Sequence, residues 1–276
     1  MSVPKACTGA TLAGDVQTVR AMMINHQQKK KQLNSNELMR LEGIIDQLSE
    51  KSMPTVSMLL TEFQDSFSLD DVTKSFLYLI FGSFPLERLR NGGTIAVCDR
   101  VTRDKLASLL VKHIDIAAVL CDHEVMMTEA REKDGNLNKL ICRVFGEYYF
   151  STLSAVLLDS RVATLMPTLM AQRTARMQTI FSMAVQWELT EIVIHLLANR
   201  LQFNVPVTLS DIDDKPPVVY AKADVLRLLL TIDEVRDSID VNSPWFWVRL
   251  RDAKEDDDEP LVDLMMLNGR IFTALA

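Results

Sequence analysis

The amino-acid sequence predicts an all-α fold, in the form of an irregular helical-repeat solenoid. Only 9 glycines and 9 prolines occur in 276 residues, below the usual shares of about 7% and about 5%. Sandwiches, barrels and glycine-looped nucleotide folds need more of these turn-forming residues, so they are disfavoured. Apolar residues make up 48% of the chain and charged residues 24%, which provides for a sizeable core.

A short apolar pattern recurs six times and predicts amphipathic helices. Each copy is an apolar residue followed three and four residues later by two more, so all three share one helical face. Successive copies start 37, 50, 47, 40 and 33 residues apart, about the length of a helix pair in stacked repeats. The six triads are Val19/Met22/Met23, Val56/Leu59/Leu60, Leu106/Leu109/Leu110, Leu153/Val156/Leu157, Val193/Leu196/Leu197 and Leu226/Leu229/Leu230.

Residues around three of these triads resemble the ankyrin-repeat family. Its helix pair reads T-P-L-H-x-A-A-x-x-G-H-x-E-I-V-x-x-L-L, followed by a turn that ends in D-V-N. The resemblance covers residues 6–24 and 178–242 and is looser over 35–160, where only the triads persist. The matching positions are Gly14, Val19, Met22, Met23, Thr179, Ala184, Glu191, Ile192, Val193, Leu196, Leu197, Asp240, Val241 and Asn242.

The chain departs from the ankyrin pattern mainly in its turns. Glu188 occupies the position of the glycine before the second helix, and Ile180 occupies the position of the proline. Because glycine normally supplies the positive φ of such turns, we expect the projecting β-turn fingers to be absent, short or replaced by helix. Tetratricopeptide-like or HEAT-like pairing is the structural alternative, since its units have similar lengths.

Local signals predict helix ends, loops and domains. Residues 68–71 and 231–234 have the pattern of capping boxes that open helices. Residues 199–217 predict a loop, and residues 260–276 a terminal capping helix. We expect N-terminal helical repeats over 1–130 and C-terminal ankyrin-like repeats over 131–276, in one continuous array. Helix starts are expected at Pro54, Pro85, Pro167 and Pro260, because the first helical turn tolerates a missing N–H.

The charge distribution gives no general attraction to nucleic acid or anionic lipid. The net charge is −7, and residues 205–276 carry 15 acidic against 8 basic side chains, so the excess of acid lies in the C-terminal quarter. Its peak, residues 255–259, is typical of a solvated loop. A docking or transport signal is the functional alternative for this acidic run.

Cysteine usage and hydropathy predict a cytoplasmic protein with reduced thiols. The four cysteines form no C-x-x-C pair, and the N-terminal residues lack the apolar segment of a secretory signal. The strongest apolar run, residues 76–81, falls short of the roughly 20 residues that a membrane span needs. We therefore expect no membrane span.

Enzyme motifs do not emerge from the sequence. It contains no phosphate-binding glycine loop and no G-x-S-x-G nucleophile turn. The densest reactive cluster is His113, Cys121, His123 and Glu124. The spacing of His113, Cys121 and His123 matches no recognised zinc site, and no neighbouring cation activates the thiol. We predict no catalytic residue, no metal and no cofactor. An enzyme with a site around these three residues is the alternative.

An aromatic and basic segment near the C-terminus is the candidate partner-binding site. If it is extended, one side presents Trp245, Trp247, Arg249 and Arg251, residue types that are frequent at protein-binding hot spots. If it is helical, these residues spread around the axis and fill the core or cap the stack, which is the favoured interpretation. Trp187 faces the same choice and is the fifth candidate.

The resemblance implies a non-enzymatic protein-binding module. Helical solenoids offer extended surfaces that usually recognise other proteins, so an adaptor, a scaffold or a stoichiometric regulator is expected, with another protein and no nucleic acid as its partner. By fold-level analogy, degenerate arrays of this kind look similar to effectors that intracellular bacteria deliver into host cells. An effector in a host cytosol, or a regulator of one, is a further form of this hypothesis.

Overall fold

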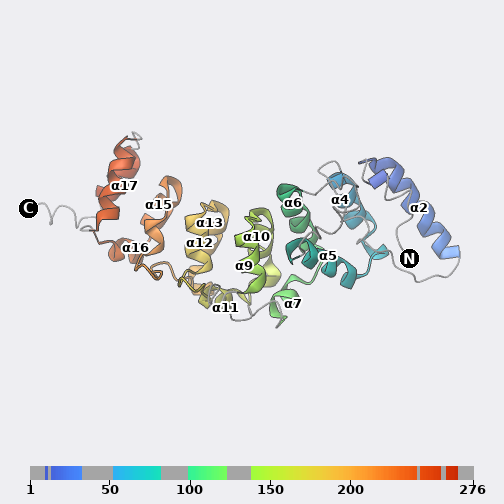
Figure 1. The fold of residues 1–276 in the computed structure, drawn as a ribbon, viewed down its shortest axis with the longest axis horizontal. Coiled ribbons are helices and arrows are strands. Elements are labelled where there is room, and N and C mark those ends of the chain that lie inside the picture. Colours follow the sequence, from blue (N-terminus) through green and yellow to red (C-terminus); the bar gives the residue numbers. More distant parts are fainter. Residues whose placement is uncertain are drawn as a thin grey trace, which may run out of the picture. The chain divides into compact units, whose positions relative to one another are not determined.

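The fold was taken from a computed structural model (Figure 1). It describes residues 10–11, 14–32, 52–81, 99–122, 138–240, 243–255 and 259–266. The regular elements in these ranges are helices, and no β-strand occurs there, which confirms the all-α prediction. The chain forms two compact units, residues 1–122 with 143–159 and residues 123–142 with 160–276. The predicted boundary between residues 130 and 131 lies outside the described residues.

Unit 1 is built from pairs of packed helices. α10 packs against α6, α6 against α5, and α2 against α4. An ion pair joins the last two, because the Arg20 guanidinium donates to both carboxylate oxygens of Glu62 at 2.7 and 2.6 Å. The elements are α2 (Val16–Gln32), α4 (Met53–Glu62), η2 (Gln64–Ser66), α5 (Leu69–Phe81), α6 (Arg100–Val111), α7 (Ile116–Cys121) and α10 (Phe150–Leu157). The helix α9 (Lys139–Gly146) is divided between the units, and its residues from 143 on belong to unit 1.

Unit 2 consists of shorter helices. α12 packs against α13 and against η5, while α15 packs against α13, α16 and α18. Figure 1 shows α12 and α13 side by side, with α15 and α16 following them. The elements are η4 (Ser160–Val162), α11 (Met166–Ala171), α12 (Ile180–Gln186), α13 (Thr190–Ala198), α14 (Arg200–Phe203), η5 (Pro217–Val219), α15 (Ala223–Leu230), α16 (Asp233–Ser238), α17 (Pro244–Glu255) and α18 (Glu259–Met266).

The apolar triads supply the core faces of six helices. They lie in α2, α4, α6, α10, α13 and α15, and every member is buried except Met22, Leu109 and Leu197, which are half-buried. The helical prediction for the triads is therefore confirmed. Burial of apolar area at this spacing holds each helix to its neighbours.

Three helix-to-helix turns share one hydrogen-bond pattern. At Gly14, Tyr148 and Glu188, φ is 74°, 58° and 55°, and each N–H donates to the carbonyl three residues earlier at 3.0–3.1 Å. In each turn the next N–H donates to the carbonyl five residues earlier at 2.9–3.0 Å. These paired bonds define a Schellman motif. A helix starts two residues after each left-handed residue. The apolar triad of that helix starts three residues after the first residue of the helix.

A buried carboxylate from α6 caps the N-terminus of α10. Asp104 is 8% exposed, and its two carboxylate oxygens accept from the N–H groups of Ser151 and Thr152 at 2.9 and 2.8 Å. The Thr152 hydroxyl also donates to Asp104 Oδ1 at 2.8 Å. The first N–H groups of a helix lack partners within the helix. Here the acceptor is the side chain of Asp104, which lies 47 and 48 residues earlier in the sequence than the two donors.

Several expected helix ends differ from the structure. Residues 231–234 form no capping box, because Thr231 follows α15 and its hydroxyl donates to the Leu228 carbonyl at 2.7 Å. The predicted loop over 199–217 contains the short helix α14. Pro54, Pro167 and Pro260 each lie in the first turn of a helix, whereas Pro85 lies outside the described residues. The terminal helix is described only as α18.

Candidate protein-binding surface

Two short loops of unit 2 have the same hydrogen-bond pattern. In the first, the Thr174 N–H donates to the Gln178 carbonyl at 2.9 Å and the Met177 N–H donates to the Thr174 carbonyl at 2.9 Å. In the second, the corresponding bonds run from Asp211 to Lys215 and from Asp214 to Asp211, both at 3.1 Å. Met177 and Asp214 both have left-handed backbone, with φ of 61° and 58°. We call these segments, 174–178 and 211–215, the paired loops.

The first side chain of each loop closes its turn. Thr174 Oγ1 accepts from the Gln178 N–H at 3.2 Å, and Asp211 Oδ1 accepts from the Lys215 N–H at 3.1 Å. A backbone bond from the Ile212 N–H to the Arg176 carbonyl, 2.9 Å long, then joins the two loops. The loops are therefore held at a fixed spacing, although each is only five residues long.

The second loop is also fastened to η5. The Tyr220 hydroxyl, which follows η5, donates to Asp211 Oδ2. Burial opposes ionisation of Asp211, but the hydrogen bonds from Tyr220 and from the Lys215 and Asp213 N–H groups outweigh it, so the pKa of Asp211 is lowered. Burial and the bond to Asp211 raise the pKa of Tyr220. Near neutral pH the pair is therefore a phenol donating to a carboxylate.

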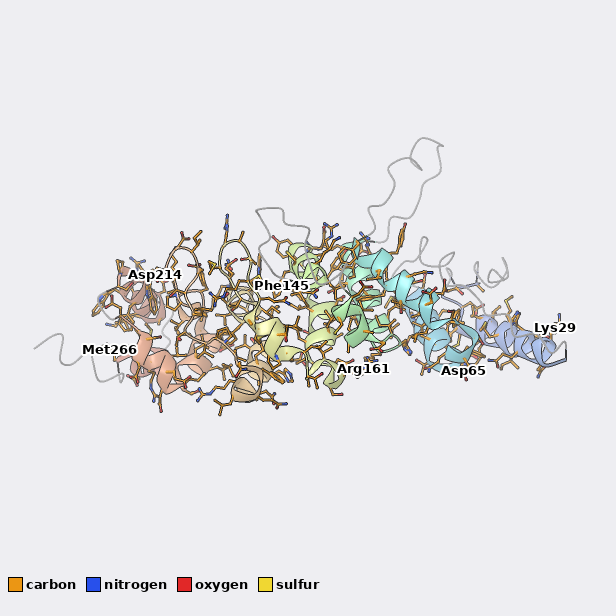
Figure 2. All side chains as sticks on the ribbon, turned by 90° about the horizontal axis from the view of Figure 1, so that it is seen from below. Lys29, Asp65, Phe145, Arg161, Asp214 and Met266 are labelled. Carbon is orange, nitrogen blue, oxygen red and sulfur yellow. The ribbon has the colours of Figure 1, made fainter. Side chains whose placement is uncertain are left out.

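The paired loops present apolar and charged side chains to solvent. Met177 is 43% exposed and Ile212 is 64% exposed. Arg176 and Lys215 are also exposed, as is Asp214, which is labelled in Figure 2. Exposed apolar side chains on a rigid backbone with a charged rim are typical of protein-binding surfaces.

Sequence reasoning missed the paired loops because it equated missing glycine with missing turns. Non-glycine residues with positive φ are uncommon, yet five described ones have it here: Tyr148, Met177, Glu188, Asn204 and Asp214. The available signal was the side-chain oxygen at Thr174 and Asp211, 37 residues apart, which can close a turn locally.

The C-terminal aromatic segment is helical rather than extended. α17 buries Phe246, Leu250 and Ala253, which are four and three residues apart and so share one face. Trp245 is half-buried, whereas Trp247 and Arg251 are exposed. Arg249 lies in α17, and its side chain lies outside the described residues. The structure thus places Trp247 and Arg251 on one helix face, four residues apart.

Trp187 belongs to a different part of unit 2. It lies in the turn between α12 and α13, directly before the left-handed Glu188, and its side chain is exposed. The Glu188 carboxylate accepts from Lys222 Nζ at 2.9 Å, which ties this turn to the start of α15. Trp187 is thus a second exposed aromatic residue of this unit, on an element other than α17.

The reactive cluster is only partly described. His113 is half-buried in the turn after α6, and Cys121 is exposed at the end of α7. His123 lies outside the described residues. In the parts of the chain that the structure describes, no group of three or more His, Cys, Asp and Glu side chains is arranged to hold a metal ion.

Comparisons with protein-family models, with curated proteins and with solved structures found no match to this chain.

No helix among the described residues is long and apolar enough to cross a membrane. The acidic run at 255–259 lies mostly outside the described residues, because residues 256–258 are not among them.

Proposed function

We propose that this chain is a non-enzymatic protein-binding module made of degenerate ankyrin-like repeats, and that it acts as an adaptor, a scaffold or a stoichiometric regulator. The paired loops carry this proposal. They repeat one hydrogen-bond pattern, are joined by the Ile212–Arg176 bond, and expose Met177 and Ile212. Two exposed apolar side chains on loops that are hydrogen-bonded to each other support a binding role.

Other features support the repeat arrangement. The shared turn at Gly14, Tyr148 and Glu188 precedes three triad helices at the same offset. The 37-residue spacing of the paired loops is close to the 33 residues of an ankyrin repeat. Repeats of this kind stack into a continuous array with an extended binding surface. Ankyrin repeats place a β-turn beside each helix pair, so the paired loops favour the ankyrin-like arrangement.

The binding surface of this module comprises Met177, Ile212 and Arg176, with Trp187, Trp245, Trp247, Arg249 and Arg251 as further candidates on unit 2. The partner is another protein. The cytoplasmic location and the role of a delivered bacterial effector, or of a regulator of one, stay predictions from the sequence.

The test is capture of a partner by the full chain from a native lysate, followed by reconstitution from purified components. We expect a stoichiometric complex that the double variant Met177→Asp/Ile212→Asp weakens at least about tenfold, a loss of about 1.4 kcal/mol. Leu201→Asp in α14 is the matched control, since Leu201 is 81% exposed and lies outside the loops. Equal weakening by the control, or no stoichiometric partner, contradicts the proposal.

A further inference from the structure

The two paired loops carry opposite charges. The first loop contains Arg176, Arg173 directly precedes it, and residues 173–178 include no acidic side chain, which gives a charge of +2. The second loop, residues 211–215, contains three aspartates and one lysine, which gives −2. Because the bond from the Ile212 N–H to the Arg176 carbonyl fixes the loops side by side, the surface has a basic half and an acidic half.

Each half has one exposed charge that no ion pair neutralises. Arg176 and Asp214 are exposed, and neither forms an ion pair within the ranges that the structure describes. Asp213 is paired with Lys215 of its own loop at 3.9 Å. Asp211 is held by hydrogen bonds within unit 2. The charges that a second molecule can reach without competition are therefore those of Arg176 and Asp214, which is labelled in Figure 2.

The surface is complementary to itself. An interface with two-fold symmetry brings residue i of one copy against residue j of the other, and residue j against residue i. A half-turn about an axis through the paired loops therefore places each basic half against an acidic half, and Met177 against Ile212. A partner with charge of a single sign would face like charge on one of the two loops, which is unfavourable. A second copy avoids this at both loops.

We infer that the paired loops of two copies of this chain bind each other around a two-fold axis, with Arg176 of each copy facing Asp214 of the other and Met177 packed on Ile212. The inference goes beyond the proposed function, because it needs no other protein. A partner and a second copy would contact the same side chains, so the dimer must dissociate before a partner binds.

Two opposing effects set the strength of this dimer. The net charge of −7 opposes self-association, but exposed charges more than about 8 Å apart are largely screened at physiological salt, so the side chains in contact decide. Two five-residue loops are fewer residues than the roughly 20–30 on each side of a standard interface. We therefore expect a reversible dimer with a dissociation constant of roughly 10–100 μM.

Sedimentation velocity of the full chain, at concentrations below and above this range, tests for the dimer. The native chain should change from monomer to dimer as its concentration rises. The double variant Met177→Asp/Ile212→Asp should weaken dimerisation at least about tenfold, because it buries charge against charge at the apolar contact. Leu201→Asp, whose side chain in α14 is 81% exposed in the native chain, should dimerise as the native chain does.

A charge exchange tests the two-fold arrangement. Arg176→Glu and Asp214→Lys each place like charges together at two sites of the dimer, so each should weaken it at least about tenfold. In a mixed dimer of the two variants, one contact joins the two exchanged charges, which are opposite, and the other contact is native. Mixing the two variants, with one of them fluorescently labelled, should therefore restore association to about the native strength.

Matched controls exclude a general effect of charge and a folding defect. Lys254→Glu in α17 and Asp263→Lys in α18 change exposed side chains outside the loops and alter the net charge as Arg176→Glu and Asp214→Lys do. Both should dimerise as the native chain does, alone and mixed. Recovery of association on mixing Arg176→Glu with Asp214→Lys cannot arise from unfolded chains.

Three outcomes overturn the inference. They are a native chain that stays monomeric throughout the concentration range, a dimer that Met177→Asp/Ile212→Asp leaves intact, and a mixture of Arg176→Glu with Asp214→Lys that does not associate. A monomeric chain that still captures a partner protein overturns only this inference. A dimer with these properties in a chain that captures no stoichiometric partner contradicts only the proposed function.

Discussion

The hairpins α9–α10 and α12–α13 turn in the same way but are held by different means. Both pass through a left-handed residue, Tyr148 or Glu188, with matching backbone bonds. The second helix of the first hairpin receives its cap from Asp104 on α6. In the second hairpin the first helix, α12, is capped locally, by a capping box between Thr179 and Ser182, and Lys222 ties the turn to the start of α15. The same turn geometry thus occurs beside a helix cap from a distant segment and beside a helix cap from a neighbouring residue.

The two kinds of helix cap should differ in how many helices are destabilised when the cap is removed. Removal of a long-range support should affect α6 and α10 together, whereas loss of a local support should affect one helix of one unit. Hydrogen exchange resolved by peptide can separate these responses, because it reports the free energy of opening of each segment. The following variants test and sharpen this contrast, in order of decreasing effect.

Substitution of the long-range cap should have the largest effect. Asp104→Ala leaves the Ser151 and Thr152 donors without their acceptor, and buried unpaired groups cost roughly 1–3 kcal/mol each. We expect the free energy of opening of α6 and α10 to fall by about 3 kcal/mol, measured by hydrogen exchange. Asp104→Asn keeps one carboxamide oxygen as an acceptor and should lose about half as much. Unchanged protection of α10 in Asp104→Ala would contradict the capping role.

The local cap should have an intermediate and more confined effect. Thr179 Oγ1 accepts from the Ser182 N–H at 3.0 Å, and Ser182 Oγ accepts from the Thr179 N–H at 2.9 Å. Thr179→Ala should lower the free energy of opening of α12 by about 1–2 kcal/mol, with α10 protected as before. Thr179→Ser retains the hydroxyl and serves as the control. Equal loss of protection in both units would argue against the difference between the hairpins.

Glycine substitutions can show that the two turns are alike. A side chain in left-handed backbone costs about 1–2 kcal/mol. The free energy of unfolding of Glu188→Gly, measured by urea denaturation, should therefore exceed that of Glu188→Ala by about 1 kcal/mol. Both variants lose the contact with Lys222, so the comparison isolates the backbone. Tyr148→Gly and Tyr148→Ala, which both lose the ring, should differ by the same amount. A difference in only one hairpin would show that the turns are under unequal strain.

pH can distinguish the paired loops, which differ in the group that closes the turn. Thr174 does not titrate, whereas the pKa of Asp211 is lowered from its usual value of 3.8. A lowered pKa in the folded state stabilises the fold above the unfolded-state pKa, and this contribution is lost as pH falls through the folded value. Asp211→Asn should thus cost up to about 1 kcal/mol at pH 7, and this cost should shrink as the pH falls below 3.8 and through the lowered pKa of Asp211.

The control for this comparison is Thr174→Val, whose cost should stay constant over the same pH range. Urea unfolding at several pH values, followed by far-ultraviolet circular dichroism, measures both variants. A pH-independent cost of Asp211→Asn would show that ionisation of this carboxyl does not hold the loop.

Much of the helical architecture followed from local patterns in the sequence. The triads of α10 and α13 are predictable because apolar residues at helical spacing must be buried together wherever the helix packs. The C-terminal segment was harder, because the alternation of Trp245, Phe246 and Trp247 also fits a strand, although the helical interpretation was favoured. α18 packs on α17 and settles the choice.

The candidate site was only partly predictable. Trp187, Trp247 and Arg251 were found as residue types that suit binding, and the structure exposes all three. Met177 and Ile212 were missed, because single apolar residues in loops carry no periodic signal. Their significance depends on the bond between Ile212 and Arg176, which joins residues 36 positions apart.

The sequence by itself determined that this chain is helical, where its apolar faces lie and that its charge is mostly acidic near the C-terminus. These properties depend on short-range spacing and composition, which act wherever the chain folds. Only the tertiary structure decided that Asp104 caps α10, that Met177, Glu188 and Asp214 adopt glycine-like backbone, and that two loops lie side by side. Such choices depend on packing between distant segments, which compensates locally unfavourable conformations.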